Sequence, residues 1–167
     1  MKIKNTKSGF TLLETIIAIA VISLVITATA QLTQSSISIG GKSMRQFIAN
    51  HLAEEGLEVV RNMRDSNWLQ NQEWKKGLAD GVYTIQENFG NENGKWSLSR
   101  VLTADSVPEL ALNENEKFER TIEISSLGKG GENLSIRVKS IVKYHDGNKA
   151  KELFLTADLT NWKKGPL

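Results

Sequence analysis

The N-terminal part of the chain is dominated by a long stretch without charge. Residues 15–41 carry no charged side chain, and most residues between 15 and 30 are apolar. A short leader with three lysines, Lys2, Lys4 and Lys7, precedes this stretch. Residues 10–30 would extend about 31 Å as an α-helix, which is enough to cross the hydrocarbon core of a bilayer. The pattern therefore predicts a membrane-spanning helix near the N-terminus.

One carboxylate, Glu14, stands at the entrance of this stretch. An acidic side chain within a membrane costs up to about 2.5–3.5 kcal/mol, and less near the interface. A helix N-terminus attracts negative charge, and Thr11 three residues earlier fits a capping box with Glu14. These roles explain why an acid is tolerated here, and they leave open a further role for the carboxylate.

An ordinary secretory signal peptide is the main alternative for this region. It would have the same basic start and apolar middle, and Ala28-Thr29-Ala30 satisfies the small-x-small cleavage rule. The charge of Glu14 inside the apolar region is unusual for such a peptide. The helical pattern also continues past Ala30, which argues against a mature chain that begins there.

Residues 7–14, Lys-Ser-Gly-Phe-Thr-Leu-Leu-Glu, followed by an apolar helix, resemble the processing site of type IV prepilins and of the pseudopilins of type II secretion. The resemblance implies that a prepilin peptidase cuts between Gly9 and Phe10 and methylates the new amine of Phe10. It also implies that Glu14 contacts the N-terminal amine of a neighbouring subunit during assembly. The chain departs from many pilins in having no cysteine pair and no proline in the apolar helix.

The resemblance sets our expectation for domain organisation. We expect a cleaved leader at 1–9, a transmembrane and assembly helix at 10–30, an amphipathic continuation at 31–66, and a β-rich exported domain at 67–167. The leader lysines predict a single pass through the cytoplasmic membrane with the N-terminus inside. The resemblance implies that the subunit then enters a periplasmic or extracellular filament. Expected partners are other pilin subunits, the peptidase, the membrane assembly platform and, before assembly, lipid.

The second half of the predicted helix is amphipathic. Met44, Phe47, Leu52 and Val59 recur at helical spacing, and we expect this stripe to pack on one face of a sheet. The Gly40-Gly41 pair could loosen or break the helix, because each glycine costs about 1 kcal/mol relative to alanine. We expect the helix to end between 65 and 68.

The remainder of the chain alternates as β-strands do. Strands are predicted at 82–85, 96–102, 118–126, 134–144 and 151–159, with residues 103–117 as a loop. Asp146-Gly147-Asn148-Lys149 is typical of a hairpin turn. The resemblance implies a pilin-like α+β fold in which a long N-terminal helix packs on about four antiparallel strands.

No residue pattern points to catalysis, a metal or a cofactor. His51 and His145 are far apart and lack clustered ligands, so a zinc site is not expected. Five polar residues could hold calcium in principle, but they lack the spacing of an EF-hand, and we expect them to lie in solvated loops. They are Asn91, Glu92, Asn93, Asp105 and Glu114.

The charge of the chain does not favour binding to nucleic acid. Removing the three leader lysines leaves 18 basic and 19 acidic side chains, which gives no electrostatic footprint for nucleic acid.

We therefore expect a non-enzymatic structural subunit, a minor pilin or pseudopilin, of a type IV pilus or type II secretion-like filament. The alternative is a signal-anchored or secreted small β-domain that binds a ligand and has no filament role.

Overall fold

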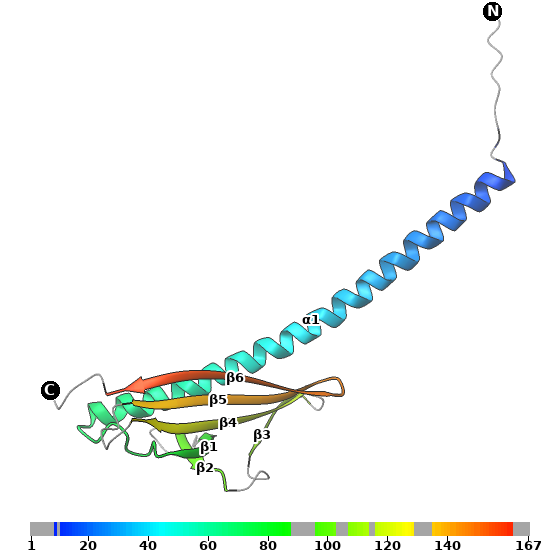
Figure 1. The fold of residues 1–167 in the computed structure, drawn as a ribbon. Coiled ribbons are helices and arrows are strands. Elements are labelled where there is room, and N and C mark those ends of the chain that lie inside the picture. The colour runs from blue at the N-terminus through cyan, green and yellow to red at the C-terminus, as the bar shows by residue number, and fades with distance from the viewer. Residues whose placement is uncertain are drawn as a thin grey trace, which may run out of the picture. The chain divides into compact units, whose positions relative to one another are not determined.

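The computed structural model describes residues 9, 11–87, 96–102, 107–113, 116–128 and 135–161. These residues form one long helix, α1, followed by six β-strands (Figure 1). The chain divides into two compact units, residues 1–43 and 44–167, and the division falls inside α1. The predicted α+β class, with a long N-terminal helix packed against an antiparallel sheet, is confirmed.

Helix α1 extends from Leu12 to Leu69 and continues through Gly40 and Gly41 without the break considered from the sequence. Its C-terminal end is closed by a Schellman-type arrangement one residue beyond the predicted range. Asn71 adopts a left-handed conformation with φ of 53°, and its N–H donates to the Trp68 carbonyl at 3.0 Å. The next N–H, of Gln72, donates to the carbonyl of Asn67 at 2.8 Å, so two terminal carbonyls are satisfied.

The first unit contains the apolar part of α1. Residues 12–40 are exposed along their whole length, although many of them are large and hydrophobic. By length and composition, one stretch of α1 suits a membrane span, and no part of that stretch is buried by the rest of the chain. Because the chain itself does not cover these side chains, lipid or other proteins must do so.

The six strands form one antiparallel sheet in the order β2-β1-β4-β5-β6, and β3 also pairs with β4. β4 and β5 pair along almost their full lengths, and β6 pairs with β5 on the other side. β3 and β1 share the remaining edge of β4, β3 near its start and β1 near its end. The strands are β1 (Gly81–Glu87), β2 (Trp96–Arg100), β3 (Glu109–Asn113), β4 (Glu116–Leu127), β5 (Ser135–Asp146) and β6 (Lys149–Thr160).

Two sequence predictions about the sheet were wrong. The segment 103–117, expected to be a loop, contains β3 and the first residues of β4, and the sheet has six strands instead of about four. Three of the five residues of β3 are Glu, Ala and Asn, which are depleted in strands, so its conformation comes from pairing with β4. The predicted hairpin turn is confirmed: Gly147 has φ of 62°, and Asp146 pairs with Lys149.

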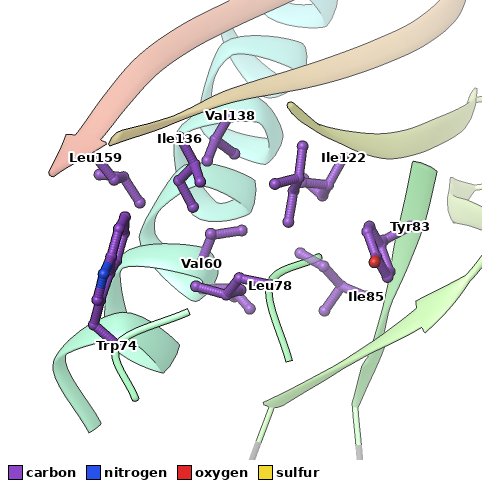
Figure 2. Close-up of a cluster of buried hydrophobic side chains, with 11 residues drawn as sticks. Val60, Trp74, Leu78, Tyr83, Ile85, Ile122, Ile136, Val138 and Leu159 are labelled. Atoms are coloured by element: carbon purple, nitrogen blue, oxygen red, sulfur yellow. The ribbon is translucent and has the colours of Figure 1, made fainter. Parts of the chain in front are cut away.

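The core lies between the sheet and the second half of α1. Figure 2 shows Val60 of α1 among side chains from the 70–80 loop and from the inner faces of the strands. Alternate residues of β4 and β5 are buried, as expected for a sheet with one covered face. The main cluster comprises Val59, Val60, Trp74, Leu78, Tyr83, Ile85, Ile122, Ile124, Ile136, Val138 and Leu159.

The helix face that meets the sheet differs from the predicted stripe. Val59 is buried and Leu52 half-buried, but Met44 and Phe47 are 57% and 58% exposed. Small side chains occupy most of the contact, because the helix backbone approaches the strands closely. The buried residues of α1 are Ala49, Ala53, Gly56, Val59, Val60 and Arg64.

Gly56 marks the closest approach. A Cβ atom on this glycine would stand 2.3 Å from Ser140 Oγ and 2.7 Å from Ile122 Cδ1. Both of these neighbours belong to the inner face of the sheet and are fully buried. Only glycine therefore fits at this position without displacing the side chains of Ser140 and Ile122.

Candidate functional site: the N-terminal segment

The start of α1 is set by Thr11. Its carbonyl accepts hydrogen bonds from the N–H groups of Glu14 and Thr15 at 3.1 and 3.2 Å, and its Oγ1 accepts from the Glu14 N–H at 3.4 Å. Thr11 itself lies outside the helix, so it acts as the N-cap that the sequence predicted. The helix therefore begins two residues after Phe10, and Gly9 lies exposed before it.

Glu14 lies in the first turn of α1 with an exposed side chain. Within the described part of the chain, its carboxylate takes no hydrogen bond or ion pair, including the reciprocal bond of a full capping box. The N-terminal end of a helix carries partial positive charge, which favours a carboxylate at this position. The side chain is therefore tolerated by its helix and remains available to a group outside the chain. Phe10 lies outside the described residues.

Unlike the Glu14 carboxylate, the hydroxyl groups of the apolar stretch have hydrogen-bond partners within the helix. Each of five hydroxyls donates to a backbone carbonyl three or four residues earlier in the same helix, at 2.7 to 2.9 Å. This bonding satisfies polar side chains where water is absent. The five residues are Thr15, Ser23, Thr27, Thr29 and Thr33.

The described residues contain no group of three His, Asp or Glu side chains that could hold a metal. His51 is exposed, lies 3.4 Å from Glu54 and packs edge-on against Phe47, so it belongs to a solvated helix face. His145 is an exposed residue of β5. The polar set that we considered for calcium and expected to form solvated loops lies outside the described residues: Asn91, Glu92, Asn93, Asp105 and Glu114.

Sequence reasoning missed two polar contacts that fasten the second half of α1 to the sheet. Arg120 of β4 is 4% exposed, and its Nη1 donates to the Leu52 carbonyl at 3.1 Å and to Glu55 Oε2 at 2.7 Å. The sequence could have indicated that Arg120 is buried, because side chains alternate along a strand and Arg120 therefore shares its face with Phe118 and Ile122. Its partner, 65 residues away, could not be identified from the sequence.

The second contact joins α1 to the β5–β6 hairpin. The Arg45 guanidinium donates to Asp146 Oδ1 at 2.5 Å and lies 3.9 Å from Glu116. Lys151 lies 3.4 Å from the other oxygen of Asp146. The hydrogen bond from Arg45, supported by Lys151, holds the pKa of Asp146 below its ordinary value of 3.8.

Comparison with known proteins bears on the N-terminal segment. Residues 4–30 match the family model described as the prokaryotic N-terminal methylation motif. This motif is the signature of type IV pilins and pseudopilins, so the recognition made from residues 7–14 is confirmed. Searches of curated proteins and of solved structures returned no match.

The motif covers residues 4–30, and the fold agrees with the role that the motif suggests. A pilin-type methylation motif, an apolar helix that suits a membrane anchor, and a sheet packed on the second half of that helix support a pilin- or pseudopilin-like structural role. The motif also implies processing by a prepilin peptidase and assembly with other pilin subunits.

Proposed function

We propose that this chain is a minor pilin or pseudopilin, a non-enzymatic subunit of a type IV pilus or type II secretion-like filament. The observation that carries the proposal is the methylation motif at residues 4–30, with Glu14 exposed and unpaired among the described residues. Glu14 is also the only charged residue between Lys7 and Lys42. The absence of a cysteine-closed loop favours a minor subunit over a disulfide-looped major one.

The first step of the proposed pathway is processing. A prepilin peptidase removes residues 1–9 by cutting between Gly9 and Phe10, and then methylates the amine of Phe10. The position of Gly9 supports this step, because it lies exposed before the first turn of α1 and leaves its backbone accessible. The helix cap at Thr11 keeps the start of α1 beyond the proposed cleavage bond.

The second step is assembly. Residues 10–30 first hold the subunit in the cytoplasmic membrane, with the leader lysines inside and residues 31–66 and 67–167 exported. An assembly platform then transfers the helix from lipid to a bundle of similar helices. The Glu14 carboxylate of one subunit pairs with the Phe10 amine of a neighbour, which neutralises both charges away from water.

The mass and N-terminal sequence of the mature protein, purified from its native membrane, test the proposal. A chain that begins at Phe10 with one added methyl group supports the prepilin pathway. A chain that begins at Gln31 would contradict it and favour the secreted β-domain, and an intact N-terminus would favour a signal anchor.

Replacement of Glu14 tests the assembly role. We expect Glu14→Ala to be cut and methylated normally but to enter sheared filaments at least tenfold less, because the neighbouring amine keeps an unpaired charge. The matched control is Glu54→Ala, which removes a carboxylate that is 63% exposed on the second half of α1. Equal incorporation of both variants would remove the proposed role of Glu14.

A further inference from the structure

The sheet has one long free edge, formed by β6. This strand is the last one in the sheet order, and among the described residues only β5 pairs with it (Figure 1). All twelve residues from Lys149 to Thr160 pair with β5 in one continuous register, without a bulge. In an antiparallel pair, alternate residues point their N–H and C=O groups away from the neighbouring strand. The outer side of β6 therefore carries a row of backbone donors and acceptors that no described strand uses.

Most of this edge lacks the features that usually protect an edge strand. Proteins commonly protect such edges with proline, with a β-bulge, or with charged side chains that point inward. Residues 152–160 contain no proline, lysine or arginine. Lys149 and Lys151 lie at the hairpin end of the strand, where Lys151 is 3.4 Å from Asp146. The side chains of 152–160 on the covered face are all apolar, namely Leu153, Leu155, Ala157 and Leu159.

The side chains along this edge determine what kind of strand would fit beside it. On the covered face, Leu153 is only half-buried, although it packs on a hydrophobic cluster. On the opposite face, Phe154 is 56% exposed. Glu152 is also exposed, and its carboxylate takes no hydrogen bond or ion pair within the described part of the chain. A fitting strand therefore carries apolar residues opposite Leu153 and Phe154 and a basic residue opposite Glu152.

β5 is an example of such a strand within the same sheet. Its Lys143 lies opposite Glu152. The next positions along the pair bring Val142 opposite Leu153. Side chains of a strand stand above and below the sheet, so they face a neighbour on either edge in a similar way. A segment with the residue pattern of β5 would therefore meet matching side chains along the outer edge of β6 as well.

We propose that the outer edge of β6 is a docking site for an extended segment of a partner protein, which adds to the sheet as a further antiparallel strand. In binding of this kind, backbone hydrogen bonds supply affinity and the alternating side chains supply selectivity. The segment carries a basic residue followed, toward its N-terminus, by apolar residues that face Leu153 and Phe154. The proposal depends on the sheet alone and not on the proposed filament role.

A synthetic peptide with the sequence of residues 135–146 tests the site, because it carries the pattern of β5. The labelled peptide is added to the full chain in detergent micelles, and we expect saturable binding by fluorescence anisotropy. Hydrogen exchange followed by NMR should slow at every second amide of residues 151–159, because only alternate N–H groups point outward. Binding without this alternating protection, or no binding at all, would overturn the proposal.

Reversing the charge of Glu152 tests the selectivity of the site. Glu152→Lys should weaken binding of this peptide about fivefold, because like charges then face each other across the new strand pair. A peptide that carries Lys143→Glu should bind this variant more tightly than it binds the unmodified chain. The matched control is Glu119→Lys, which reverses an exposed carboxylate on β4, two strands away from the edge, and should leave both affinities unchanged.

Equal weakening by Glu152→Lys and Glu119→Lys would indicate a general effect of charge and would contradict docking at this edge. Sedimentation of the full chain without peptide tests the remaining occupant. A dimer whose alternate amides in residues 151–159 are already protected would assign the edge to a second copy of this chain and overturn the proposal of a separate partner.

Discussion

At the scale of single residues, Gly56 determines how closely α1 lies on the sheet. It is a poor helix former inside a helix, yet it faces Ser140 and Ile122, where no side chain fits. The Ser140 hydroxyl opposite it is fully buried and has no hydrogen-bond partner among the described residues. Close packing of the helix backbone on the sheet therefore offsets the low helix propensity of Gly56 and the unsatisfied hydroxyl of Ser140.

Replacing Gly56 with alanine should destabilise the unit formed by residues 44–167. The added methyl group must displace Ser140 or the Ile122 side chain, and overpacking of this kind costs about 1–3 kcal/mol. Denaturant unfolding of the detergent-solubilised chain measures the effect. The control is Gly40→Ala, whose Cβ meets nothing within 4 Å and should leave this transition unchanged. Equal midpoints for the two variants would show that the sheet yields freely at Gly56.

At the scale of elements, the tie between α1 and the β5–β6 hairpin makes stability depend on pH. Because Arg45 and Lys151 lower the pKa of Asp146 in the folded state, this contact stabilises the fold above the unfolded pKa of about 3.8. The contribution is lost as pH falls through the lower, folded pKa. Acid should therefore weaken the attachment of the hairpin to the helix.

Replacing Arg45 with methionine should raise the pKa of Asp146 toward its ordinary value, as followed by NMR titration of the carboxyl group. The stability difference from the unmodified chain should be largest at neutral pH and should shrink as pH falls through the lowered pKa of Asp146 in the folded state. Arg61→Met is the control, because Arg61 pairs with Glu58 inside α1 and lies outside the Asp146 contact. A stability difference that stays constant across this pH range would argue against the ionic role.

The elements also show what the sequence could predict. Strands β4 and β5 were found because one covered face makes buried and exposed residues alternate along each of them, and β6 was found from the hairpin turn that precedes it. β3 was missed because its residues do not favour a strand and its conformation depends on β4. Periodicity identified an apolar side of the helix, but it could not show that Met44 and Phe47 lie beyond the sheet contact while alanines fill it.

The N-terminal site was predictable for a different reason. Its elements lie within residues 7–14, so their spacing is visible without knowledge of the fold. The contacts of Arg45 and Arg120 join residues 101 and 65 positions apart, and no local pattern reveals such pairs. Local chemistry could therefore be read from the sequence, whereas the attachment of the helix to the sheet required the structure.

At the scale of the whole molecule, the two compact units differ in what stabilises them. Residues 44–167 contain both hydrophobic clusters and the contacts of Arg45 and Arg120. Residues 12–40 bury nothing against the rest of the chain. The second unit should therefore fold without the first.

A chain limited to residues 44–167 should be soluble and should unfold cooperatively. Its thermal midpoint should lie within a few degrees of the corresponding transition of the full chain in detergent, because no core residue is lost. Circular dichroism and calorimetry measure both quantities. A truncated chain that lacks a cooperative transition would show that the first unit supports the second.

The hydroxyl groups of the apolar part of α1 are already satisfied within their own helix. Because Thr15, Ser23, Thr27, Thr29 and Thr33 already donate to their own backbone, they require no particular acceptor on a neighbour. Beyond Glu14, residues 15–33 therefore expose an apolar surface whose hydroxyl groups are compatible with many apolar surroundings, including helices of unrelated sequence. These hydroxyl groups therefore cannot distinguish one neighbouring protein from another, and any such discrimination must come from other side chains of the chain.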